Sequence, residues 1–399
     1  MSYGRMAYDR LAGINFERMR EYRLQRTKEA MAKHGIDVLI TWDAYSIRYI
    51  TGGYATVPCR FPQAQMVVLP INGDPHCFLT TSFSCYELRK EMPWLKNKIW
   101  APPGGLKWAR NVDELETHMA KIVPIIEEHG QKNGVIGFDG CCSELMMTEA
   151  LKRKGVTRFK HAEEAMFDAR VIKNEDEIAC MRMACNSATA AFYEIKKALV
   201  PGVRECDLVG VGMKKLYELG ADGVQEFVCS SGPRTSPLHI DYTDRAINPG
   251  NVVCIDINGN SYMGYKSCYY RTFVCGEATA LQKQVYEDCR AMMYAGMEGI
   301  KAGNSTADIV KGWPQSPKYW AMIIGLTWPA MLWAMVWGCR SMKRPNSSAP
   351  IRPPPPTPCW KRAWLWRWRP GPAAWTPSMA PSASAWRRIS SSQRTAMNC

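Results

Sequence analysis

Acidic residues and histidine are absent from the last 79 residues of this 399-residue chain. Residues 321–399 hold two lysines and nine arginines, so they contribute +11 to the formal net charge of +14. The +3 that remains on residues 1–320 is an ordinary balance and excludes a basic surface that extends over the whole chain. The main body is therefore predicted to bind neither nucleic acid nor membrane.

No C-x-x-C pair occurs among the sixteen cysteines. Several of them have apolar neighbours, as Cys180 and Cys185 do, which is typical of reduced thiols rather than of a disulfide framework. The N-terminus also lacks an apolar run long enough for a signal peptide. These features predict a cytoplasmic location.

The chain is long enough for two domains with full cores. Residues 14–35 and 112–129 are predicted to form helices, since apolar side chains recur there at helical spacing. Short apolar strands are expected between such helices, for example at 37–40 and 134–139. This alternation predicts an α/β domain over residues 1–165.

Residues 166–320 are predicted to form a second domain after a linker at 167–173. Asn174 is a good helix N-cap, and Glu177 can complete a capping box with it. Further helices are expected at 178–199, 205–218 and 281–302. With the strands between them, they predict an α+β arrangement in which helices cover one side of the strands.

A β-hairpin is predicted within residues 251–276, with a glycine-containing turn near 259–264. Pairing of its two strands would bring Asp256, Asn258 and Cys268 onto one face. Carboxylates from both strands would be the usual way to hold a divalent metal there. Only Asp256 supplies one, so the hairpin predicts a metal site that lacks part of its ligands.

Three motifs in order resemble those of one enzyme superfamily. They are ARVIKNEDEIACMR at 169–182, SGPRTSPLH at 231–239 and NPGNVVCIDINGNSYMGYKSCYYRTF at 248–273. They resemble the creatinase/prolidase/aminopeptidase superfamily, the pita-bread hydrolases. The resemblance implies an N-terminal α/β creatinase-like domain and a pita-bread catalytic domain truncated near residue 320. The N-terminal half, with DAYSIRYITG at 43–52, is also similar to dimethylsulfoniopropionate lyases.

The resemblance also implies roles for individual residues. His239 would be the hydrogen-bond donor and proton-transfer group at the substrate, a role that suits a neutral imidazole. Asp256 falls on the first metal-binding Asp of the family, and Cys268 falls on the second. A thiolate is a poor replacement for a carboxylate between two hard divalent ions. Asn258 could bind metal through its amide oxygen or cap a turn. A packed hairpin that binds no metal is the alternative for all three residues.

A hydrolase of the Xaa-Pro peptidase/prolidase type is the activity that the resemblance implies. It further implies a small peptide or amide substrate, a divalent metal and a homodimer. Water bound by metal, or held by His and Glu, would attack a C–N bond beside a polarised carbonyl. A lyase of the dimethylsulfoniopropionate type, a metal-free creatinase-like hydrolase and a non-enzymatic, membrane-associated protein stay open as alternatives.

The C-terminal tail, residues 321–399, lacks the one His and two Glu ligands that the family has downstream. It contains nine of the fifteen Trp and twelve of the 26 Pro, a composition that cannot form a regular core. Residues 321–337 form an apolar run at the short limit for a membrane helix. Pro329 interrupts that run, which argues against a membrane anchor.

A one-base shift of the reading frame explains this composition. Suppose that each true codon begins with the last base of a codon of the present sequence. The codons of residues 333–338 then encode Gly-x-Gly-x-Gly, and the codons of residues 341–343 are compatible with His-Glu. Residues 360–370 then encode Glu followed by Leu, Met or Val at alternate positions, and 385–389 permit another Glu. Because these are the missing motifs in their family order, we interpret the tail as out-of-frame and the enzyme as impaired.

Resequencing the gene tests this interpretation. We expect a single-base insertion or deletion between codons 313 and 321, because Trp320-Ala321 already encodes Gly in the shifted frame. The repaired protein should be more soluble than the present chain, since it regains the segments that cover apolar surface. An uninterrupted frame through these codons would contradict the interpretation.

Overall fold

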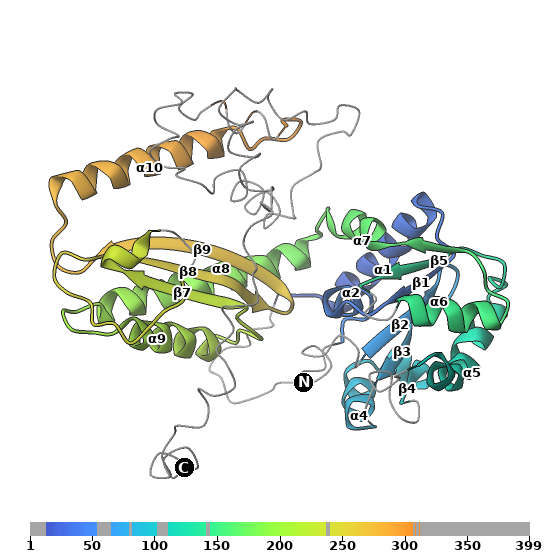
Figure 1. The fold of residues 1–399 in the computed structure, drawn as a ribbon. Coiled ribbons are helices and arrows are strands. Elements are labelled where there is room, and N and C mark those ends of the chain that lie inside the picture. Colours follow the sequence, from blue (N-terminus) through green and yellow to red (C-terminus); the bar gives the residue numbers. More distant parts are fainter. Residues whose placement is uncertain are drawn as a thin grey trace, which may run out of the picture. The chain divides into compact units, whose positions relative to one another are not determined.

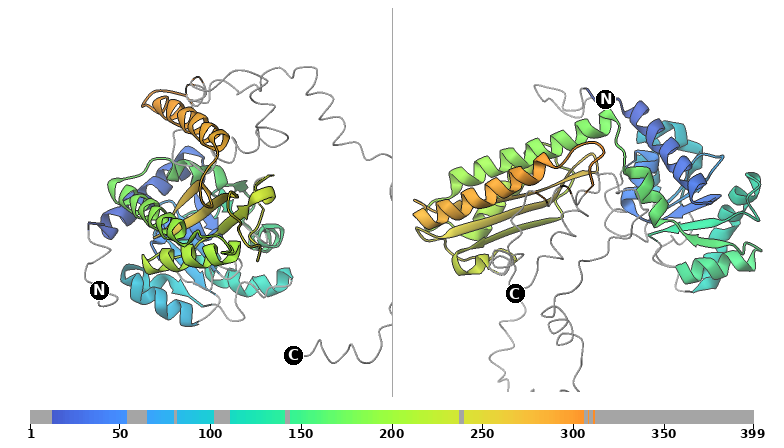
Figure 2. Two further views of the ribbon diagram at one scale, coloured as in Figure 1. Left: turned by 90° about the vertical axis from the view of Figure 1, so that its left-hand side faces the viewer. Right: turned by 90° about the horizontal axis from the view of Figure 1, so that it is seen from above.

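Two β-sheets organise the part of the chain that the structure, a computed structural model, describes (Figures 1 and 2). The described residues are 13–53, 65–79, 82–101, 111–140, 144–236, 240–305, 308 and 311. The tail and His239 therefore lie outside them.

The N-terminal sheet has six strands in the order β4-β3-β2-β1-β5-β6. Their bounds are β1 Val38–Thr41, β2 Gln65–Pro70, β3 His76–Leu79, β4 Ile99–Trp100, β5 Ile136–Asp139 and β6 Phe159–His161. The pairs β1–β2 and β2–β3 are antiparallel, and the other three pairs are parallel. Every residue of the central β1 is buried, as expected for a strand with helices on both faces.

Helices cover both faces of this sheet. One face packs against α1 (Phe16–Lys33), α2 (Ala44–Thr51), α4 (Ser82–Glu91), the 3-10 helix η2 (Pro93–Lys98) and α7 (Glu163–Arg170). The other face packs against α5 (Val112–Glu128) and α6 (Glu144–Arg153). Leu39 belongs to the first core, whereas Val38 and Ile40 belong to the second. The predicted α/β architecture is confirmed.

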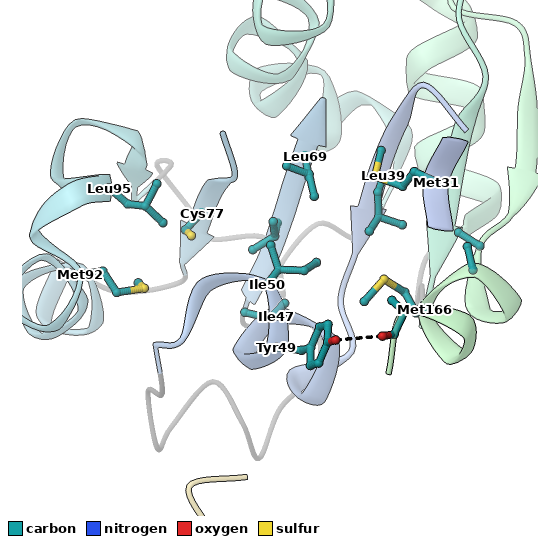
Figure 3. Close-up of a cluster of buried hydrophobic side chains, with 14 of the residues drawn as sticks. Met31, Leu39, Ile47, Tyr49, Ile50, Leu69, Cys77, Met92, Leu95 and Met166 are labelled. Atoms are coloured by element: carbon teal, nitrogen blue, oxygen red, sulfur yellow. Dashed lines mark hydrogen bonds between the residues drawn. The ribbon is translucent and has the colours of Figure 1, made fainter. Parts of the chain in front are cut away.

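Figure 3 shows the first of these cores, where Met31, Leu39 and Ile50 meet. The buried Tyr49 donates a hydrogen bond to the Ala169 carbonyl at 2.9 Å, so its hydroxyl is satisfied inside the apolar cluster. This bond connects α2 to the end of α7. The Tyr49 hydroxyl thus holds the end of α7, the last helix of the N-terminal domain.

The second sheet has three antiparallel strands in the order β7-β8-β9. Its elements are α8 Glu175–Ala198, α9 Glu205–Glu218, β7 Glu226–Ser231, the 3-10 helix η4 Gly232–Thr235, β8 Val252–Tyr262, β9 Tyr265–Val274 and α10 Ala280–Glu298. Helices α8 and α9 cover one face, with Ile195 and Leu208 in the same core as Val253 and Ile255 (Figure 1). The predicted α+β arrangement is confirmed for these residues.

The predicted capping box at α8 is present. Glu177 donates its backbone N–H to Asn174 Oδ1 at 2.9 Å, and its carboxylate accepts from the Asn174 amide at 2.8 Å. The same carboxylate accepts from the Tyr265 hydroxyl at 2.5 Å and lies 3.6 Å from Arg23 Nε. Arg23 and Glu177 are both almost fully buried. This cluster therefore joins α1, α8 and β9 through one buried carboxylate.

The structure refines several local expectations. Helix α7 continues to Arg170, so residues 167–170 of the linker predicted at 167–173 are helical. Helix α2 was not predicted, although Asp43 is its N-cap and accepts a hydrogen bond from the Ser46 amide. Strand β8 passes through Gly259 to Tyr262, so the hairpin turn lies at residues 263–264, the end of the predicted range 259–264.

Within the described residues, no helix is long and apolar enough to cross a membrane. The apolar run at 321–337 lies outside them.

Glu177→Ala should destabilise the fold by about 3–5 kcal/mol, because it leaves the Arg23 charge buried without its partner. The measurement is the urea midpoint followed by circular dichroism. Glu175→Ala is the matched control, since the side chain of Glu175 lies two residues away and is 69% exposed. Equal urea midpoints for the two variants would show that the buried cluster does not contribute to the stability of the fold.

Candidate functional site

The register of the β8–β9 hairpin brings the predicted site residues together. Asn258 lies directly opposite Cys268, and Asp256 lies opposite Tyr270. Ile255 and Ile257 belong to the core with α8 and α9. Because side chains alternate along a strand, Asp256 and Asn258 lie on the opposite face of the sheet.

A β-bulge at Gly259 preserves this arrangement. One extra residue in β8 makes Asn260 pair with Ser267, directly after the Asn258–Cys268 pair. Asn260 then turns toward α8, where it donates to the Ala184 carbonyl at 2.8 Å. Gly259 has a φ of +69°, and a Cβ added there would lie 2.5 Å from the Gln225 Cβ. Only glycine fits this position without strain.

Asp256 and Cys268 form the centre of the site. Asp256 is 3% exposed, and the Cys268 thiol donates to its Oδ1 at 3.8 Å. Tyr270 lies against both side chains. Burial raises the pKa of Tyr270, and the charges of Asp256 and Cys268 and hydrogen bonds to both raise it further. The phenol therefore stays protonated at neutral pH and can act as a hydrogen-bond donor.

Glu226, at the start of β7, is a site residue that the sequence did not reveal. It pairs with Asn258 in the β7–β8 register, and Asn258 Nδ2 donates to its Oε2 at 3.1 Å. Strands between the helices of the second domain were predicted, but the register of β7 against β8 was not. Had the register been known, the alternation of the two strands would have placed Glu226 beside Asn258.

His239 lies outside the described residues, but the chain on both sides of it is anchored by one carboxylate. The fully buried Glu205 accepts from the Ser231 amide at 2.8 Å and from the Thr243 amide at 2.9 Å. Both hydroxyl groups and Arg234 also donate to it. Burial alone would raise the pKa of Glu205, but these hydrogen bonds outweigh burial and lower it. Glu205 therefore remains ionised and holds Ser231 and Thr243 close together.

The hairpin residues do not fit a pair of hard divalent ions. Within the described ranges, no three His, Cys, Asp or Glu side chains are grouped to hold a metal ion. The donor set consists of one carboxylate, one thiol and one amide, and that amide donates to Glu226. Hard cations prefer several carboxylate oxygens. Asp256, Asn258 and Cys268 share a face as predicted, but their role as metal ligands stays a prediction.

Comparison with known families gives two matches in tandem. Residues 23–172 match the creatinase/prolidase N-terminal domain, and residues 179–318 match metallopeptidase family M24. The boundary between the two matches falls at the end of α7 and the start of α8.

Among similar proteins, the uncharacterized peptidase YqhT of Bacillus subtilis is 30% identical over 294 residues, 72% of this chain and 76% of that protein. The Xaa-Pro dipeptidase of Pyrococcus furiosus is 27% identical over 50% of this chain, which spans only 60% of that protein. The dimethylsulfoniopropionate lyase DddP of Roseovarius nubinhibens is 24% identical over 76% of this chain and 69% of that protein.

Solved structures with the same fold include an Xaa-Pro dipeptidase from Bacillus anthracis, with a TM-score of 0.58 and 23% identity. That similarity covers 74% of this chain and 78% of the other. A prolidase from Thermococcus sibiricus has a TM-score of 0.59 at 19% identity and covers 76% and 79% of the two chains. At these sequence identities of 23% and 19%, the similarity shows a shared fold only.

Cys268→Asp should raise the affinity of the hairpin for Mn²⁺ at least about tenfold. A second carboxylate beside Asp256 creates a like-charge pair that a hard cation relieves. Isothermal titration calorimetry measures the effect, and Cys289→Asp, which changes an exposed cysteine of α10, is the control. Equal affinity in the two variants would show that position 268 does not limit metal binding.

Proposed function

Because the chain belongs to the creatinase/prolidase/aminopeptidase superfamily, with a creatinase-type N-terminal domain ahead of an M24 metallopeptidase domain, we propose that it is a hydrolase of the Xaa-Pro peptidase type. Its substrate would be a small peptide or amide. The observation that carries this proposal is the tandem of both domains, with the buried Asp256 on the sheet face opposite α8 and α9.

The reaction would be attack of water on a carbonyl carbon, followed by cleavage of the adjacent C–N bond. His239 would donate a hydrogen bond to the substrate and transfer a proton, a role that the family resemblance implies. Glu205 supports that role, since it anchors the chain at Ser231 and Thr243, on either side of His239. Tyr270, protonated beside Asp256, is a further donor on the same face.

The activity of the present chain would be impaired. The family's remaining His and Glu ligands would fall in residues 321–399, which contain neither residue type. The donor set of Asp256, Asn258 and Cys268 favours a metal-free version of the hydrolysis over one with a pair of hard ions. We further propose a cytoplasmic homodimer, on the basis of the family resemblance and the reduced thiols.

A lyase is the second candidate function. The alignment with the dimethylsulfoniopropionate lyase DddP extends over 325 residues and includes both domains. In such a lyase, a base removes a proton alpha to a carboxylate and dimethyl sulfide leaves. The two candidates therefore differ in their products, which are free proline from a peptidase and a volatile sulfide from a lyase.

A substrate screen on the frame-corrected protein, with the present chain in parallel, separates these candidates. We expect cleavage of Xaa-Pro dipeptides, measured as released proline, with little activity in the present chain. Metal analysis of the same preparations by mass spectrometry then distinguishes metal-dependent from metal-free hydrolysis. Release of dimethyl sulfide without peptide cleavage would establish the lyase instead.

In the corrected protein, His239→Ala should lower kcat by about 10²–10⁴-fold, the usual effect of losing a positioned acid–base group. His161→Ala is the matched control, because the side chain of His161 is 83% exposed and lies in the N-terminal domain. If both variants keep full activity, the role assigned to His239 is wrong.

A further inference from the structure

The turn of the β8–β9 hairpin, at residues 263–264, contacts helix α2 of the N-terminal domain. Arg48 of α2 forms an ion pair with Asp222, with 2.6 Å between Nη1 and Oδ2. The Asp222 carboxylate also accepts a hydrogen bond from the Gly264 amide at 3.1 Å. Because Arg48 is only 9% exposed, water screens this pair less than it screens a surface ion pair. One carboxylate therefore connects α2 to the hairpin turn.

The backbone of the turn also packs directly against the Arg48 side chain. Gly264 has a φ of +85°, a conformation that residues with a Cβ rarely adopt. A Cβ added at Gly264 would lie 2.9 Å from Arg48 Cδ. The contact between α2 and the turn thus combines close packing with opposite charge.

The segment 222–226, which leads into β7, extends this contact to the candidate site. The Asp222 amide donates to the Ser261 carbonyl at 2.9 Å, and the Ser261 amide donates to the Gly223 carbonyl at 2.8 Å. Further along the same segment, Glu226 pairs with Asn258 and accepts a hydrogen bond from its side chain. The segment that Arg48 holds at Asp222 is therefore the one that brings Glu226 to Asn258.

A second connection runs through Lys266 of β9. Its Nζ donates to the Tyr45 hydroxyl of α2 at 2.5 Å and to Gln225 Oε1 at 2.8 Å. The same ammonium lies 4.0 Å from the centre of the Tyr45 ring. Gln225 in turn lies against Gly259, the position of the β-bulge in β8. Two side chains of α2 thus hold the segment 222–226 at two points.

We propose that Arg48 and Tyr45 are positioning residues for the candidate site, because they fix the segment 222–226 against β8. Through Asp222 and Lys266 they set the geometry of the strands that carry Asn258 and Cys268. Side chains that act together must be held within about 0.5 Å of their working geometry, which requires such supporting contacts. A catalytic effect of Arg48 and Tyr45 rests on the proposed function, whereas their effect on the geometry of the site does not.

The Cys268 thiol reports this geometry in the full chain, since it donates to Asp256 Oδ1 when the site is intact. Arg48→Met removes the charge of Arg48 but keeps an unbranched apolar side chain. We expect this variant to raise the rate at which iodoacetamide alkylates Cys268 about fivefold, the effect of losing roughly one hydrogen bond. The rate is measured by mass spectrometry relative to that of Cys289, an exposed thiol of α10.

Arg18→Met is the matched control. Arg18 of α1 pairs with Asp176 of α8, with 2.8 Å between Nε and Oδ2, so it also connects the two domains but not through the segment 222–226. It should leave the Cys268/Cys289 ratio unchanged. Arg48→Lys keeps the positive charge and should restore most of the native ratio, which a general loss of packing would not explain. An unchanged ratio in Arg48→Met, equal increases in the two Arg→Met variants, or no restoration by Arg48→Lys would overturn the proposal.

A milder variant tests the second connection if Arg48→Met does not fold. Tyr45→Phe removes one hydroxyl from a side chain that is 51% exposed, and so it should fold normally. We expect the Cys268/Cys289 ratio to rise about twofold, since Lys266 loses its hydrogen bond to α2. Tyr193→Phe, on α8, is the control, because its side chain is 63% exposed. Equal ratios in these two variants would overturn the role of Tyr45.

Activity of the frame-corrected protein separates this proposal from the proposed function. Native ratios in every variant, together with cleavage of Xaa-Pro dipeptides, would overturn the positioning roles and leave the hydrolase intact. The expected ratios without any peptide cleavage would support the positioning roles and overturn the hydrolase.

Discussion

The register of β8 between β7 and β9 is the constraint on which the candidate site depends. Side chains alternate along a strand, so a slip by one residue would move Asp256 into the apolar core and Ile255 or Ile257 onto the opposite face. The bulge at Gly259 confines the extra residue of β8 to one position. The pairs before it therefore keep Asn258 opposite Cys268, while Asn260 beyond it bonds to α8.

The features that could be predicted from the sequence are those with a local signal. The capping box of Asn174 and Glu177, helix α9 and the two hairpin strands each depend on residues close together in the chain. The shared face of positions 256, 258 and 268 also followed, because the alternation of a paired strand is regular. Local signals therefore predicted most of the second domain and the common face of three residues of the candidate site.

The features that were missed depend on distant contacts. Glu226 joins the site only because β7 pairs with β8 in one particular register, which its own sequence does not encode. Glu205 resembles an ordinary first-turn acid of a helix, yet it is fully buried and accepts from Ser231 and Thr243. The role of Gly259 as a bulge rather than a turn likewise depends on the partner strand and on Gln225.

The alternation of β8 also has an evolutionary consequence. Ile255 and Ile257 lie in the apolar core and stabilise the fold, whereas Asp256 and Asn258 lie on the other face and make polar contacts. Neighbouring residues of β8 therefore have separate surroundings. A substitution at 258 or 268 can then alter the donor set while the packing against α8 and α9 stays intact. Such a scaffold tolerates mutational drift on its polar face, because neither Asn258 nor Cys268 belongs to the core that packs against α8 and α9.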